Sequence, residues 1–139
     1  MTTNKTNQTK TKQTEANMTT KQLQDKVDRA IGRMMSAAAE LRLFAKVTNI
    51  TANVVKNQVQ AQARYYQAVI DIACAKHDYY CAMADEQRGV NRVMAEIYET
   101  AAMNIRDIIQ ARVKGHFTID EFYAKVDAAY HAAKVTVVY

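Results

Sequence analysis

The chain has 139 residues, of which 49% are hydrophobic and 24% charged, and its formal net charge is +5. It contains no proline and three glycines, so the residues that usually build tight turns and hairpins are scarce. This length and composition favour one globular domain made of a few long helices. No run of eighteen apolar residues occurs, which excludes a transmembrane helix.

The first eighteen residues are mostly Thr, Asn, Gln and Lys. Lys5, Lys10 and Lys12, set against Glu15, supply +2 of the net charge and leave +3 for the rest of the chain. A segment with so few apolar side chains buries too little surface to offset its ordering entropy. We therefore predict that residues 1–18 form a flexible basic arm, disordered or pinned by a partner, and that residues 19–139 form a helical bundle domain.

An amphipathic helix is predicted to begin at Thr19 or Thr20, since threonine is a good N-cap. A second line on this helix consists of small residues, Gly32, Ser36 and Ala39. Such a line either lets another helix come close or faces solvent, and the solvent-facing interpretation is preferred. The main apolar stripe recurs every three or four positions: Leu23, Val27, Ile31, Met34, Ala38, Leu41 and Ala45.

A second helix is predicted to follow a short connection at residues 47–51, capped by Thr48 or Thr51, and to run to about Arg88. Two apolar lines along it indicate packing on two sides. At about 38 residues this helix is roughly 57 Å long, whereas a compact chain of this size has a radius of gyration of about 14 Å. The length indicates an elongated bundle or an oligomer. One line repeats every seven residues: Val54, Ala61, Ala68, Ala75 and Ala82.

The third helix depends on how Gly89 is interpreted. It is either a C′ glycine, with Asn91 capping the next helix, or a residue inside one unbroken helix over 50–114. We favour the break. Lys114 and Gly115 predict a helix end, because a lysine suits the negative end of the helix dipole and a glycine suits C′.

The last helix has the clearest local signal. Thr118 and Glu121 form a predicted capping box, and Phe117 is placed to pack against Phe122 as a hydrophobic staple. The final residues, 135–139, are Val-Thr-Val-Val-Tyr. They are either a helix end docked on the core or an extended tail that adds to a partner.

Metal binding is weighed at two places, first at the cysteines. Cys74, His77 and Cys81 share one helix face at spacings of three and four. Tetrahedral zinc takes ligands that converge from more than one element, so we expect packed, reduced thiols and no metal site. Two cysteines seven residues apart on a helix are about 10 Å apart, too far for a disulfide. Reduced thiols favour a cytoplasmic location.

The second place is a set of acidic residues, Asp71, Asp78, Glu96 and Glu99, which could assemble a metal or catalytic site between helices. The Glu-x-x-His pair of such bundles does not occur, and no nucleophile elbow, P-loop or dinucleotide motif is present. We therefore assign no catalytic residue and no cofactor, and favour an acidic stripe that pairs with nearby basic side chains: Arg64, Lys76, Arg88 and Arg92.

Tyrosine is the most distinctive residue type, with eight tyrosines beside three phenylalanines and no tryptophan. The pairs Tyr65–Tyr66 and Tyr79–Tyr80 lie fourteen residues apart, close to four helical turns. Tyrosine combines apolar area with a hydroxyl group and is enriched at protein interfaces. These pairs therefore indicate a protein interface more than the base stacking that a nucleic-acid-binding surface would need.

The sequence as a whole predicts an all-α, elongated antiparallel bundle of three to four long helices. The favoured function is a non-enzymatic structural or interaction protein that assembles with itself or into a larger cytoplasmic or virion assembly. A viral or phage protein fits this composition. A nucleic-acid-binding helical protein is the alternative, and a helical metal protein or enzyme is the third. The predicted interface residues are Tyr65, Tyr66, Tyr79, Tyr80, Val137, Val138 and Tyr139.

Overall fold

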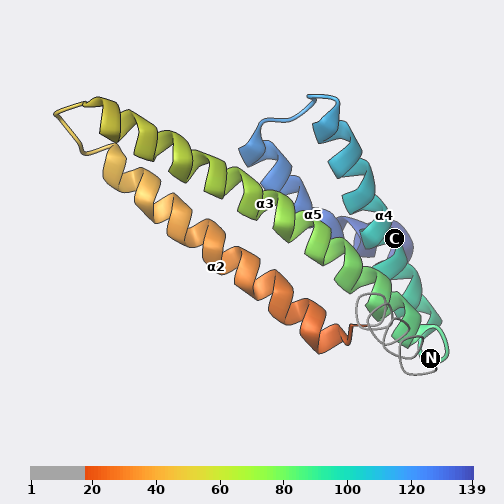
Figure 1. The fold of residues 1–139 in the computed structure, drawn as a ribbon. Coiled ribbons are helices and arrows are strands. Elements are labelled where there is room, and N and C mark those ends of the chain that lie inside the picture. The colour runs from red at the N-terminus through yellow and green to blue at the C-terminus, as the bar shows by residue number, and fades with distance from the viewer. Residues whose placement is uncertain (1–17) are drawn as a thin grey trace, which may run out of the picture.

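The computed structural model describes residues 18–139 and contains four helices in that range (Figure 1). They are α2 (Thr20–Phe44), α3 (Ala52–Gln87), α4 (Arg92–Val113) and α5 (Ile119–Val138). The predicted all-α fold is confirmed, and no strand occurs in the described part. The predicted basic arm, except for Met18, lies outside the described residues. None of the four helices has the length and apolar character that crossing a membrane requires.

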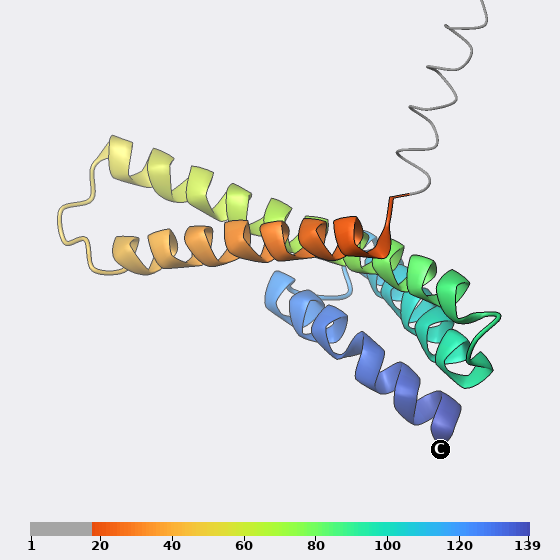
Figure 2. The same ribbon diagram turned by 90° about the horizontal axis from the view of Figure 1, so that it is seen from below.

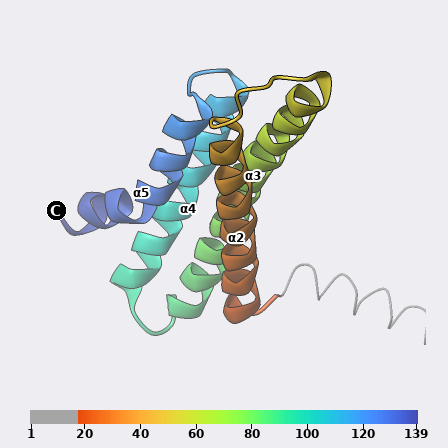
Figure 3. The same ribbon diagram turned by 90° about the vertical axis from the view of Figure 1, so that its left-hand side faces the viewer.

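Successive helices pack side by side, so that α2 lies along α3, α3 along α4, and α4 along α5 (Figures 2 and 3). The central helix is α3, which contacts all three of the others. The 36 residues of α3 make it about 54 Å long, whereas α4 has 22 residues and is about 33 Å long. The result is an elongated antiparallel bundle in which α2 and the first part of α3 extend beyond α4 and α5 (Figures 1 and 2).

Each helix begins at a side-chain cap. Thr19, Thr51, Asn91 and Thr118 each accept a hydrogen bond from the backbone N–H three residues ahead, at 3.1 to 3.2 Å. Such a cap satisfies one of the amides left free in the first turn of a helix. The predicted caps Thr19, Thr51 and Thr118 and the predicted break before Asn91 are confirmed.

The two glycines at helix ends differ in conformation. Gly115 has a φ of 82°, and it donates to the carbonyl of Arg112 at 2.8 Å while His116 donates to Ala111 at 3.0 Å. These two bonds form a Schellman motif, which confirms the predicted end of α4. Gly89 does not have a positive φ, so its predicted role as a left-handed C′ glycine is wrong. The chain turns there without needing that conformation.

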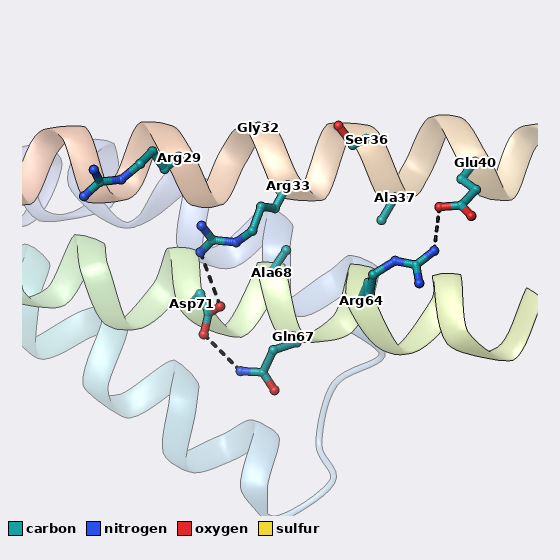
Figure 4. A pocket seen from close by; sticks show the side chains of 10 residues that line it. All are labelled: Arg29, Gly32, Arg33, Ser36, Ala37, Glu40, Arg64, Gln67, Ala68 and Asp71. Atoms are coloured by element: carbon teal, nitrogen blue, oxygen red, sulfur yellow. Dashed lines mark hydrogen bonds and ion pairs between the residues drawn. The ribbon is translucent and has the colours of Figure 1, made fainter. Parts of the chain in front are cut away.

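The core lies between α3, α4 and α5 and extends to α2 through Ala30. The largest side chains that the core encloses are Phe122, Ile72, Ile97, Ile105, Val69 and Val126. The line of residues that repeats every seven positions along α3 packs differently, because its three central members are alanines. A methyl group lets two helix backbones approach closely, and Ala68 of α3 and Ala37 of α2 both point into the space between these helices (Figure 4). The fully enclosed members of that line are Ala61, Ala68 and Ala75.

Ion pairs and side-chain hydrogen bonds connect neighbouring helices at the edges of their contacts. Lys76 of α3 pairs with Asp127 of α5 at 3.6 Å, and the Tyr65 hydroxyl donates to Asp120 at 3.2 Å. The Thr20 hydroxyl donates to Glu86, which ties the start of α2 to the end of α3. Exposed pairs of this kind contribute little stability each, so they fix the alignment of the helices more than the energy of the fold.

The C-terminus is helical to Val138, so the extended-tail alternative for residues 135–139 is wrong. The Thr136 hydroxyl donates to the carbonyl of Ala132 at 2.9 Å, and Val137 packs against the core. Val138 and Tyr139 are exposed. The β-branched residues are tolerated here because tertiary packing outweighs their weak helix propensity.

The two glycines provide a matched stability test. Replacing Gly115→Ala should destabilise the fold by about 1 kcal/mol, since a side chain disfavours the left-handed conformation. Replacing Gly89→Ala should be neutral or stabilise by up to about 1 kcal/mol, because the unfolded chain loses freedom there. Urea unfolding followed by circular dichroism measures both, and equal effects would contradict the assignment of these two turns.

Candidate interaction surface

A cluster of stacked tyrosines joins the three core helices. The Tyr80 ring of α3 lies 6.0 Å from the Tyr98 ring of α4 and 5.9 Å from the Tyr130 ring of α5, measured between centroids. Tyr98 and Tyr130 are 5.5 Å apart, and Tyr79 is 5.6 Å from Tyr80. Rings at these separations attract one another beyond the area that they bury. The cluster therefore contributes to holding α3, α4 and α5 together within one chain.

Burial is the main reason that the pKa of Tyr80 rises to about 12, with the neighbouring Tyr79 as the next cause. A phenolate is disfavoured where its charge cannot be hydrated. Tyr80 therefore stays neutral at pH values at which an exposed tyrosine ionises. This makes it a structural group and not a proton donor or acceptor near neutral pH.

The other predicted interface tyrosines are half-buried. Tyr65 donates to Asp120, and the pKa of Tyr65 is raised, first by burial and then by that carboxylate. Tyr66 accepts a hydrogen bond from Gln62 at 3.0 Å. Tyr65, Tyr66 and Tyr79 all pack against the core cluster, so part of each ring is already used inside the chain. Among the predicted C-terminal contacts, Tyr139 is the most accessible, with 94% of its surface exposed.

One face of α2 lacks a partner in the described chain. The backbone of α2 packs against α3 and no other described helix. That contact buries Leu23 and Val27 of the predicted apolar stripe. It also buries Ala30 and Ala37, which the predicted stripe did not include. The opposite face carries five exposed residues, of which Met35 is 61% and Leu43 65% accessible: Gly32, Met35, Ser36, Ala39 and Leu43. The preferred interpretation of the small residues as solvent-facing is confirmed for the single chain.

The charges on this exposed face of α2 are ordered along the helix. Asp25 and Asp28 lie on its N-terminal part, Arg42 lies in its last turn, and Lys46 lies in the turn that follows the helix. All four are exposed, and none forms an ion pair within residues 18–139. Beyond the exposed Lys21 in the first turn, the face thus carries two carboxylates, then small and apolar residues, and then basic residues at its other end.

A groove of about 670 Å³ lies between α2 and α3 beside this face (Figure 4). Two ion pairs cross the groove from α2 to α3: Arg33 with Asp71 at 3.5 Å, and Glu40 with Arg64 at 2.6 Å. Gly32 and Ser36 of α2 line it, so the groove is continuous with the exposed face. Because two of its three arginines are paired with carboxylates, it is not a basic track for phosphate groups.

Cys74, His77 and Cys81 lie along α3. His77 Nε2 and Cys81 Sγ are 3.8 Å apart on α3, but no group of three possible ligands converges among residues 18–139. Cys74 and Cys81 are exposed, so the prediction of fully packed thiols is wrong. Partial burial raises the pKa of both thiols, and the negative charge of Asp78 is the next largest cause. The thiols therefore stay protonated and weakly nucleophilic at neutral pH.

The acidic residues of the third alternative lie apart. Asp71 faces Arg33 across the groove, Glu96 pairs with Arg92, and Glu99 lines a separate hollow between α3 and α4. Asp78 contacts His77 of its own helix. No ligand set forms from them in the described chain. The predicted pairing is confirmed in part: Arg92 pairs with Glu96 and Arg88 with Asp85, whereas Arg64 and Lys76 pair with Glu40 and Asp127, which lie on other helices.

Comparison with protein-family models, curated proteins and solved structures finds no match to this chain. The fold and surface therefore define its class, which is an all-α elongated bundle with an unpartnered outer helix face.

Two parts of this surface were missed by reasoning from sequence. Tyr98 and Tyr130 complete the tyrosine cluster, and only the packing of α4 and α5 on α3 brings them to Tyr80. The order of charges along α2 was visible in the sequence, because Asp28 and Lys46 are five helical turns apart on one line. Only the structure shows that these charges lie on the exposed side of α2, where a partner can contact them.

The tyrosine cluster predicts a loss of stability at high pH. Tyr80 ionises near 10 in the unfolded chain and near 12 in the folded one, so deprotonation favours unfolding. The contribution of neutral Tyr80 to the free energy of unfolding is fully present below pH 10 and should fall by about 2 kcal/mol as the pH rises to 12. Urea unfolding at several pH values measures this, together with the absorbance of the phenolate.

The variant Tyr80→Phe should lose part of that pH dependence, because phenylalanine keeps the ring but cannot ionise. Tyr139→Phe is the matched control, since it also removes one phenol hydroxyl but at a residue that is 94% exposed. Identical pH profiles for the two variants would contradict the assignment of Tyr80 as the buried group.

Proposed function

We propose that this protein is a non-enzymatic assembly protein that associates with itself through exposed faces of its long helices. The observation that carries the proposal is the exposed face of α2, which keeps Met35 and Leu43 accessible beside small residues on a helix supported from one side. A helix that carries apolar residues on more than one side is normally covered on those sides. The projecting end of the α2–α3 pair adds further exposed apolar residues: Val47, Ile50, Val55 and Val59.

The chemistry of the remaining surface favours the same role. The described residues hold no convergent set of metal ligands, and the most strongly perturbed tyrosine is buried in the core. The arginines Arg33 and Arg64 are paired with carboxylates, which lowers the positive potential available to nucleic acid. Apolar area on accessible helix faces is what protein association uses.

Light scattering over a range of concentrations tests the proposal. The native chain should show a mass that rises with concentration above the 15.7 kDa of one copy. Replacing Met35→Lys together with Leu43→Lys should lower that mass toward a single copy, since two charges would then have to be buried. A native chain that stays at one copy at all concentrations refutes self-assembly.

A matched control uses apolar residues elsewhere on the surface. Val90 and Val113, at the two ends of α4, are each 82% exposed. The double variant Val90→Lys with Val113→Lys adds the same charge but should leave the mass unchanged. If both double variants dissociate the protein equally, net charge and not the α2 face controls association.

A further inference from the structure

The exposed face of α2 can be matched only by a surface with a particular order of charge. After Lys21 in its first turn, the face presents Asp25 and Asp28, then a small apolar centre, then Arg42, with Lys46 two residues beyond the end of the helix. A helical partner that runs antiparallel must therefore be basic at its start of contact, small in the middle and acidic at its end. The same face of α2, turned end to end, has this order.

We infer, resting on the proposed self-assembly, that the partner of α2 is α2 of a second copy of this chain, packed antiparallel about a twofold axis that passes between Met35 and Ser36. Asp25 and Lys46 lie equally far from that midpoint, so each faces the other residue on the second copy. Gly32 and Ala39 are likewise equidistant from it. A twofold contact of this kind uses one surface patch twice and is closed at two copies.

The second acidic residue fits the same alignment. Asp28 faces Leu43 of the second copy, with Arg42 and Lys46 on either side of it along the helix. Asp28 and Arg42 are close to four turns apart, and Asp28 and Lys46 are five turns apart, so all three lie along one edge of the face. A twofold axis perpendicular to the helix pair keeps that edge on one side of the contact, where the opposite charges meet. Lys21 falls beyond Lys46 of the second copy, where that chain has already left α2.

The centre of the contact is suited to a close approach. Gly32, Ser36 and Ala39 have short side chains, and a Cβ added at Gly32 would meet nothing within 4 Å in its own chain. Met35, one of the two large apolar side chains of the face, then lies against the short Ser36 of the other copy, and Leu43, the other, lies beside Asp28. The contact thus buries the apolar residues that the single chain leaves in water.

Charge reversal tests the alignment, because the twofold contact contains each ion pair twice. Asp25→Lys alone and Lys46→Glu alone should each weaken self-association about tenfold, since like charges then face each other at both sites. An equimolar mixture of the two variants should regain the native affinity, because both pairs become opposite in the mixed dimer. Analytical ultracentrifugation of the full chain measures all three samples.

The controls change the same charges on other helices. Asp107→Lys on α4 and Lys134→Glu on α5 are exposed and should leave self-association unchanged, alone and mixed. Circular dichroism of every variant checks that the fold is intact. A native dimer that ignores both α2 reversals, or a mixture that fails to recover, overturns this pairing and leaves the proposed self-assembly in place.

A cross-link gives an independent readout. In a background with Cys74→Ser and Cys81→Ser, Ser36→Cys should form a disulfide between two copies under mild oxidation, because Ser36 lies beside the twofold axis. Gln110→Cys, at an exposed site on α4, should not. Cross-linking at Gln110→Cys without cross-linking at Ser36→Cys places the contact elsewhere. A native chain that is monomeric throughout refutes the proposed function, and this pairing with it.

Discussion

The structure depends on the close packing of α3, whose 36 residues make it about 54 Å long. Every other described helix packs on it, and none is long enough to cover it from end to end. The alanine line at Ala61, Ala68 and Ala75 lets α2 lie near one side, while larger residues fill the space toward α4 and α5. Because the helices overlap only partly, the bundle must be elongated and must leave helix faces in water.

Tyrosine has two structural uses in this chain. Tyr80, Tyr98 and Tyr130 stack inside the bundle, where they add contact area between three helices. Tyr65 instead bridges from α3 to the start of α5 through its hydroxyl group and Asp120. A residue with an apolar ring and a polar end suits both places. Adjacent tyrosines in a sequence thus indicate a helix edge that lies between core and solvent, which does not by itself distinguish a core from an interface.

The helix ends were the most predictable features, because their signals are local. Thr118 with Glu121 and the Gly115 turn lie within a few residues of the bonds that they make, so the sequence holds all the information needed. Gly89 was predicted as a left-handed residue and is not one, since a glycine permits that conformation without requiring it. The conformation of the C-terminal valines could not be predicted, because β-branched residues fit both an extended tail and a helix end, and only tertiary packing decides between the two.

Sequence by itself determined the helices, their caps and the absence of known catalytic motifs, because periodicity and capping act over a few residues. Tertiary structure decided which faces are covered. It placed the tyrosine pairs against the core, left Cys74 and Cys81 exposed, and put the ordered charges of α2 on the side away from α3. Those outcomes depend on how far the helices overlap, which is set by contacts between residues distant in the chain and cannot be read from the spacing within one helix.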